Sequence, residues 1–158
     1  MKKQQKEYMQ EAIRLSIQNV TAHTGGPFGA VIVKDGEIIA RGTNLVTANN
    51  DPTAHAEVVA IRAACTFLGS YHLEGCEVYT SCEPCPMCLA AIYWARPAAV
   101  YYANAKEDAA AIQFDDQFIY EELSRPLAKR KLFTRQMMRE EALEAFQIWE
   151  ASTDKKEY

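Results

Sequence analysis

Three cysteines lie within seven residues in the stretch TSCEPCPMCLAAIYWA, and two of them have the spacing of metal ligands. A helix that starts at Pro84 would place Cys85 and Cys88 on the same face of its first turn. The N-terminus of a helix stabilises a thiolate, which is the form of cysteine that binds metal. Cys82 precedes the proline at the end of a predicted strand and need not point the same way. The spacing therefore predicts that Cys85 and Cys88 bind one metal ion together.

A second predicted helix start, in the stretch NNDPTAHAE, supplies a third ligand, His55, with Glu57 close behind it. In an α/β fold, helices that follow strands can begin at the same edge of the sheet. His55, Cys85 and Cys88 would then form a zinc site with three protein ligands and an open fourth position, which is typical of catalytic zinc. The combination of H-x-E with P-C-x-x-C is the pattern of zinc nucleobase deaminases. We predict one Zn²⁺ per subunit.

The chemistry expected of such a site is hydrolytic deamination. Zinc makes water a nucleophile at neutral pH by lowering its pKa to about 7. The water would attack a ring carbon that bears an exocyclic amino group, while Glu57 moves a proton to a ring nitrogen and later to the departing ammonia. Apolar surroundings would raise the pKa of the Glu57 carboxyl toward the working range. Glu57 is therefore the predicted catalytic residue.

Other uses of these thiols are open at this point. A four-iron cluster needs a fourth thiolate, for which Cys65 and Cys76 are poorly placed, in a helix interior and at a strand start. A closed structural zinc site would add Cys82 to the three ligands. A zinc-stabilised binding module without catalysis would need no Glu57 beside the metal, and Cys65 is most simply a buried apolar residue.

The elements that would position these residues alternate between helices and strands, which predicts an α/β fold with parallel crossovers after an initial hairpin. Apolar periodicity and turn signals predict helices over about 5–22, 53–69 and 84–94, and helical pieces near 106–124 and 139–151. They also predict a hairpin around Asp35-Gly36, strands at 77–81 and 98–103, and a short strand near 131–134.

Length and charge exclude several classes of protein. A chain of 158 residues has the size of one domain. No stretch has the apolar length of a signal peptide or a membrane span, so we expect a cytoplasmic protein without a membrane partner. Five cysteines, an odd number, do not favour a disulfide framework. The net charge of −4 does not favour binding to nucleic acid.

Beyond these motifs, the chain resembles the cytidine deaminase-like enzymes, and within them the bacterial guanine deaminases, nearly from end to end. The HAE and PCPMC pieces are common to the wider superfamily, and the FDD-x-FIY block and KKEY tail favour the narrower group. The matching pieces are GGPFGAVIVKDG (25–36), NDPTAHAE (50–57), YTSCEPCPMC (79–88), AIYWARP (91–97), FDDQFIY (114–120) and KKEY (155–158).

This resemblance implies a three-layer α/β/α sandwich around a central mixed five-stranded sheet. It implies one zinc-dependent deaminase domain over residues 1–158, with about 140–158 exchanged onto the partner subunit of a homodimer. The segment from about 124 to 150 matches the family least closely.

The resemblance also implies which residues bind a purine base. Asn44 would hydrogen-bond the base, Asp116 would accept from the 2-amino side of guanine, Phe28 and Phe114 would pack against the ring, and Tyr158 would help to close the neighbouring site. Simpler interpretations remain open: Asn44 could satisfy a turn, Asp115 and Asp116 could cap a helix, the phenylalanines could be core, and the tail could be frayed.

The activity that follows is deamination of guanine to xanthine and ammonia, within purine catabolism or salvage. The alternatives are a related deaminase that acts on guanosine or another aminopurine or aminotriazine, or, less favoured by the acidic charge, on adenosine in tRNA. The non-enzyme alternative is the zinc-stabilised binding module.

Overall fold

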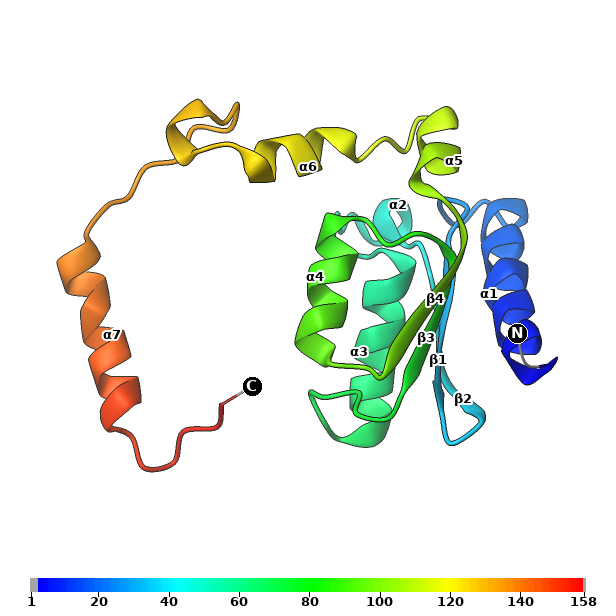
Figure 1. Cartoon of the computed structure of the whole chain (residues 1–158), viewed down its shortest axis with the longest axis horizontal. Helices are drawn as coiled ribbons and strands as arrows, with labels where there is room; N and C mark the ends of the chain where they lie inside the picture. Colours follow the sequence, from blue (N-terminus) through cyan, green and yellow to red (C-terminus); the bar gives the residue numbers. More distant parts are fainter. Residues whose placement is uncertain (1–2, 158) are drawn as a thin grey trace. The chain divides into compact units, whose positions relative to one another are not determined.

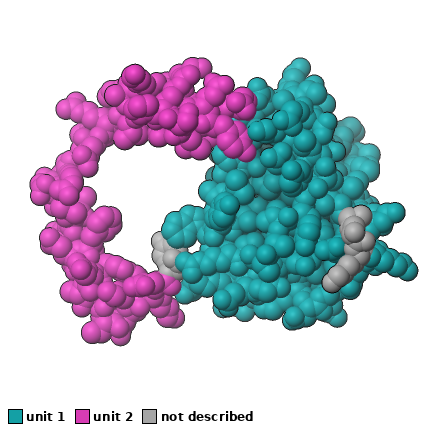
Figure 2. Space-filling model, viewed as in Figure 1, with its two compact units in different colours: residues 1–116 teal, residues 117–158 magenta. Residues whose placement is uncertain are grey.

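A computed structural model describes residues 3–157 and divides the chain into two compact units, residues 1–116 and 117–158 (Figure 2). The first unit contains four strands and five helices. In chain order they are α1 (Lys3–Thr21), β1 (Gly29–Lys34), β2 (Glu37–Thr43), α2 (Val46–Asn49), α3 (Ala56–Leu68), β3 (Glu77–Cys82), α4 (Pro86–Ala95), β4 (Ala99–Asn104) and α5 (Lys106–Ala111).

The sheet of the first unit is mixed, as predicted, and its strand order is β2-β1-β3-β4. Strand β1 runs antiparallel to both of its neighbours, while β3 and β4 are parallel. Helix α1 lies on one face of the sheet, and α3 lies on the other with α4 beside it (Figure 1). The alternation of strands and helices in the sequence therefore predicted the α/β fold correctly.

The prediction of five strands was wrong for the described residues, which contain four. The segment 131–134, a predicted strand, is not one. It belongs to the second unit, and its side chains Leu132 and Phe133 are 78% and 85% exposed. Local apolar and β-branched residues suggested a strand there, but a strand needs a ladder partner to satisfy its backbone groups.

The Asp-Gly dipeptide between β1 and β2 forms the predicted tight hairpin. Asp35 and Gly36 both have positive φ values, 51° and 83°. A two-residue hairpin turn of this kind requires positive φ at both positions, which is why Asp-Gly is its strongest short signal.

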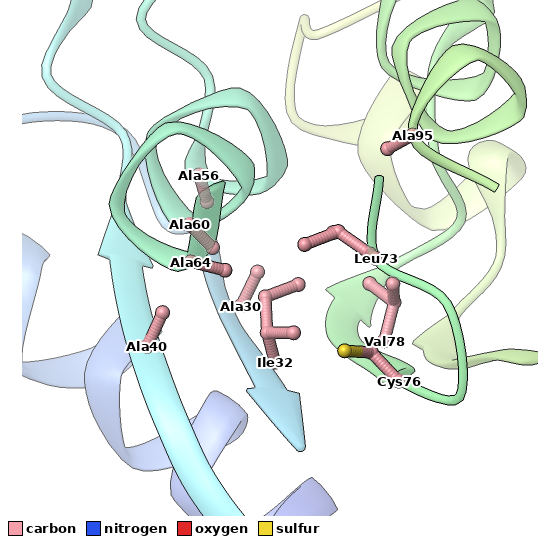
Figure 3. Close-up of a cluster of buried hydrophobic side chains, with 10 residues drawn as sticks. All are labelled: Ala30, Ile32, Ala40, Ala56, Ala60, Ala64, Leu73, Cys76, Val78 and Ala95. Carbon is pink, nitrogen blue, oxygen red and sulfur yellow. The ribbon is translucent and has the colours of Figure 1, made fainter. Parts of the chain in front are cut away.

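The core lies on both faces of β1, because successive side chains of a strand point to opposite faces. Ala30 and Ile32 pack toward α3, whose buried residues Ala56, Ala60 and Ala64 form a stripe of small side chains (Figure 3). The alternate residues of the strand pack toward α1. That second cluster consists of Val31 and Val33 with Tyr8, Leu15 and Tyr79.

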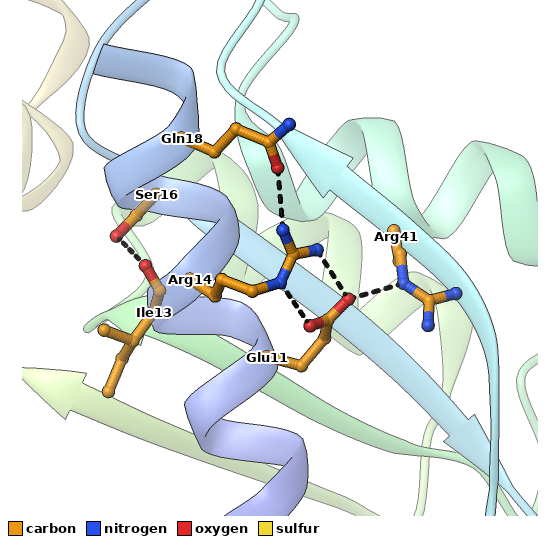
Figure 4. A network of polar contacts seen from close by, with 6 residues as sticks. All are labelled: Glu11, Ile13, Arg14, Ser16, Gln18 and Arg41. Atoms are coloured by element: carbon orange, nitrogen blue, oxygen red, sulfur yellow. Dashed lines mark hydrogen bonds and ion pairs between the residues drawn. The ribbon is translucent and has the colours of Figure 1, made fainter. Parts of the chain in front are cut away.

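Helix α1 is fixed to the edge strand β2 by one carboxylate. Glu11 accepts hydrogen bonds from Nε of Arg14, on the same helix, and from Nε of Arg41, on β2, each at 2.7 Å (Figure 4). Of the periodic apolar residues of this helix, Tyr8, Ala12 and Leu15 are buried, whereas Ile17 and Val20 are exposed.

The second unit contains α6 (Gln117–Ser124), a 3₁₀-helix (Leu127–Lys129) and α7 (Arg139–Ala151). Neither α6 nor α7 has a buried residue. The unit begins at residue 117, ahead of the segment from about 140 that the resemblance singles out, and the exchange of that segment between subunits stays a prediction. No helix among residues 3–157 has the length and apolar character needed to cross a membrane.

Candidate active site

Two helix N-termini bring the predicted metal ligands together. His55 is the N-cap residue of α3, and Cys85 is the N-cap residue of α4. Cys88 lies in the first turn of α4 and is buried. Both helices start slightly later than predicted; before α3, the Asp51 carboxylate accepts the Thr53 backbone N–H at 2.8 Å and holds that segment in a turn.

The three ligand atoms have the separations that zinc requires. His55 Nδ1 lies 3.6 Å from Cys85 Sγ and 3.5 Å from Cys88 Sγ, and all three atoms lie within 4.8 Å of one another. A tetrahedral ion with Zn–S near 2.3 Å and Zn–N near 2.0 Å holds nitrogen and sulfur about 3.6 Å apart. The His55 nitrogen therefore stands at zinc-binding distance from both sulfurs, and the three predicted ligands form a group that could hold a metal ion.

The two thiols of the site have opposite pKa shifts. The pKa of Cys85 is lowered to about 4, chiefly by a hydrogen bond from Cys88 and also by one from His55. The pKa of Cys88 is raised, because its proton is hydrogen-bonded to Cys85 and its surroundings are buried. Metal binding requires both thiols to lose their protons, so a bound cation would displace the proton that Cys88 holds. The same hydrogen bond to Cys85 raises the pKa of His55.

Glu57 lies beside the ligands and is only 6% exposed. Its Oε2 accepts a hydrogen bond from the Cys88 thiol at 3.5 Å. Burial raises the pKa of the Glu57 carboxyl, as predicted from its apolar surroundings. A carboxyl group whose pKa is raised toward neutrality can both accept and donate a proton during turnover.

Cys82 is not a ligand in this arrangement. Its thiol donates to the carbonyl oxygen of Ala105 at 3.7 Å, and burial raises its pKa to about 11. Among residues 3–157 the group that could hold a metal comprises His55 and two thiols, without Cys82, Cys65 or Cys76. The four-iron cluster and the closed structural zinc site are therefore not supported, and a zinc ion held by these three side chains would have a fourth position available for water.

Two of the predicted purine contacts are aromatic. Phe28 and Phe114 meet edge to face, with ring centroids 5.0 Å apart. Phe28 packs against the core, while Phe114 is 47% exposed. The structure therefore gives Phe28 a structural role as well, and leaves Phe114 about half exposed.

The other two predicted contacts are polar. Asn44 is buried, and its side-chain oxygen accepts the Val46 backbone N–H at 3.3 Å, so the expected turn contact exists. Its amide N–H₂ is not used in that contact. The pKa of Asp116 is raised by burial and, secondarily, by the negative charge of Cys85, so this carboxyl lies within electrostatic reach of the metal ligands. Tyr158 lies outside the described residues.

Two supporting residues were missed in the sequence. Asn19, on the buried face of α1, donates from its side chain to the carbonyl oxygens of Gly26 and Asn44, each at 2.8 Å. Glu83, inside the cysteine-rich stretch, accepts the backbone N–H of Lys106. The partners of both residues are backbone groups elsewhere in the chain, and no spacing rule predicts such contacts. The one available signal was a polar residue, Asn19, on an apolar helix face.

The fold and the ligand group together define a zinc-binding deaminase. The family model described as "Cytidine and deoxycytidylate deaminase zinc-binding region" matches residues 2–104, and the chain belongs to that family.

Within the family, the chain is similar to guanine deaminases. It is 57% identical to guanine deaminase from Bacillus subtilis over 151 residues, which cover 96% of this chain and 97% of the relative. The X-ray structure of guanine deaminase from Bacillus subtilis matches with a TM-score of 0.95 at 55% identity, over 100% of this chain and 99% of that chain. A tRNA-specific adenosine deaminase from Agrobacterium fabrum is 45% identical over a shorter stretch, 58% of this chain and 60% of the relative.

Proposed function

We propose that this protein catalyses the hydrolytic deamination of guanine to xanthine and ammonia. The observation that carries the proposal is the group of His55, Cys85 and Cys88 at zinc-binding separations with the buried carboxyl of Glu57 against it. The high identity to a relative named guanine deaminase over nearly the whole chain supports guanine as the substrate. A cytoplasmic location would keep the five free cysteines reduced.

The residues of this chain divide the chemistry between them. Zinc held by the three ligands would supply water that is nucleophilic near neutral pH. Glu57 takes a proton from the attacking water and passes it to a ring nitrogen. It then takes the remaining proton of the added hydroxyl and delivers it to the departing amino group, which leaves as ammonia. A carbon–oxygen bond forms at the carbon bearing the 2-amino group of guanine, and the carbon–nitrogen bond to that group breaks. Burial of Glu57 excludes bulk water from these proton transfers.

Recognition of guanine would come from the polar and aromatic residues around the metal. Guanine presents N–H donors at N1 and at the 2-amino group, and a carboxylate such as that of Asp116 accepts from them. Adenine presents acceptor nitrogens on the corresponding edge, which a carboxylate repels. The amide N–H₂ of Asn44 would donate to the base, and the rings of Phe28 and Phe114 would pack against it.

The second unit would act on a partner copy of the chain. Its helices α6 and α7 bury nothing of their own, and large apolar side chains such as Phe146 and Trp149 are exposed, so it needs another surface to cover them. Helix α4 of the first unit also exposes Tyr93 and Trp94. These observations support a homodimer in which the C-terminal segment crosses to the partner, with Tyr158 closing the partner's site as the resemblance implies.

The test is ammonia release by the zinc-loaded protein with guanine, guanosine, adenine, cytosine and tRNA. We expect turnover of guanine and its loss, by at least roughly 10²–10⁴-fold, in Glu57→Gln with zinc retained. The exposed carboxylate of Glu74 provides the matched control, Glu74→Gln, which should remain active. Turnover of another substrate without guanine would refute the assignment of guanine, and an active Glu57→Gln would refute the role of Glu57.

A further inference from the structure

The loop that carries Cys85 is hydrogen-bonded to residues 104–106, which lead into α5. Two of the predicted substrate contacts, Phe114 and Asp116, follow that helix. The backbone N–H of Glu83 donates to the Asn104 carbonyl oxygen at 2.8 Å, which continues the parallel pairing of β3 with β4. The thiol of Cys82 donates to the carbonyl oxygen of Ala105. The connection from β3 to α4 is therefore joined to the connection from β4 to α5, more than twenty residues later in the chain.

One side chain extends this junction to the helix itself. Oε2 of Glu83 accepts the backbone N–H of Lys106, the first residue of α5, at 3.2 Å. The first N–H groups of a helix have no partner inside the helix, so an acceptor from outside fixes where the helix begins. Here the acceptor comes from a residue two positions before the metal ligand Cys85.

The chain beyond this helix leads directly to the substrate side of the site. Helix α5 ends at Ala111, and Phe114 and Asp116 follow it. Phe114 meets Phe28, and the carboxyl of Asp116 is within the electrostatic influence of both Cys85 and Lys106. The placement of α5 relative to the metal ligands thus sets where these two side chains stand.

We propose that Glu83 is a positioning residue that fixes the start of α5 relative to Cys85 and so places Phe114 and Asp116 for substrate binding. This inference rests on the proposed guanine deaminase function. Glu83 does not contact the reacting atoms in it; it acts through the backbone of Lys106. Its loss should therefore weaken binding of guanine more than it slows the chemical step, which depends on Glu57 and the metal ligands.

The experiment compares three variants by steady-state kinetics with guanine and by zinc content. Glu83→Ala should raise KM at least roughly 10-fold, the scale of losing a hydrogen bond to a charged acceptor, with a smaller change in kcat and zinc retained. Glu83→Gln should restore most of the KM, because its amide oxygen can accept the same N–H. Asp108→Ala is the matched control, since Asp108 accepts the Ala105 N–H at 2.9 Å and caps the same helix from within it, whereas Glu83 caps it from the cysteine-rich stretch.

Three results would overturn the inference: an unchanged KM in Glu83→Ala, an equal rise of KM in Asp108→Ala, or no restoration by Glu83→Gln. If the wild-type protein did not turn over guanine, the proposed function would fail instead. Amide hydrogen exchange would then test the link alone. We expect faster exchange of the Lys106 amide in Glu83→Ala than in the wild type or Asp108→Ala, and equal rates would overturn the link.

Discussion

Gly42 provides a test of how strictly the sheet positions the catalytic helix. It lies on β2 against the first turn of α3, where an added Cβ would be 2.1 Å from the carbonyl oxygen of Ala56 and 2.6 Å from the backbone nitrogen of Ala60. Real Cβ atoms essentially never approach closer than 3.0 Å, so relief requires a displacement of about 0.9 Å, the difference between 3.0 and 2.1 Å. Because both obstructing atoms belong to the backbone, no change of rotamer can provide it.

The displaced turn is the one that carries the chemistry. His55 caps α3, and Glu57 lies in its first turn. A misplacement of about 1 Å can cost roughly 10²-fold in rate, so Gly42→Ala should lower kcat/KM for guanine by about that factor. Overpacking of this kind should also destabilise the fold by about 3 kcal/mol, at the upper end of the usual range.

Gly75→Ala is the control for this experiment. Gly75 has a φ of 73°, and nothing lies within 4 Å of an added Cβ. The substitution should cost about 1–2 kcal/mol of backbone strain without displacing a helix. Urea denaturation, zinc content and ammonia release are measured for both variants. A Gly42→Ala protein as active and as stable as Gly75→Ala would refute the reasoning. It would mean that α3 can shift by about 0.9 Å without loss of activity, although His55 and Glu57 lie at its start.

Two further predictions concern the thiols and the pH dependence of stability. Cys88→Ser should lose bound zinc, whereas Cys82→Ser should keep it, as measured by metal analysis after gel filtration; equal zinc contents would contradict the ligand assignment. The pKa of Glu11 is lowered to about 2 by hydrogen bonds from Arg14 and Arg41, so its stabilisation is complete above its usual pKa and is lost as the pH falls toward 2. Since both arginines are about half exposed, this contribution should be about 1 kcal/mol. The stability difference between wild type and Glu11→Gln in urea should therefore shrink between pH 6 and pH 3, and a constant difference would contradict it.

The parts of the fold and site that were predicted from sequence are those encoded by short patterns. The Asp35-Gly36 hairpin follows from two adjacent residues that tolerate positive φ. The zinc ligands follow from two local motifs, each at a helix start, and from the rule that such starts meet at one edge of an α/β sheet. Spacing alone also separated Cys82 from the two cysteine ligands.

The parts that could not be predicted depend on contacts between distant segments. The buried face of α1 includes Asn19, whose partners are carbonyl oxygens of two loops, and a polar residue at that position contradicts the simple apolar pattern. The wrong strand at 131–134 has suitable residues, but pairing depends on a neighbour that local sequence does not specify. The contact of Glu83 could not be predicted either, because its partner is the backbone N–H of Lys106, more than twenty residues later in the chain.

Two of the four described candidate base contacts, Phe28 and Asn44, lie within the part of the chain that the family model matches, and the other two lie beyond it. The family match ends at residue 104, and all three zinc ligands and Glu57 precede that point. Phe114 and Asp116 follow it, on the chain beyond α5. We therefore expect substrate binding to depend on the contact between Glu83 and Lys106 more than metal binding does.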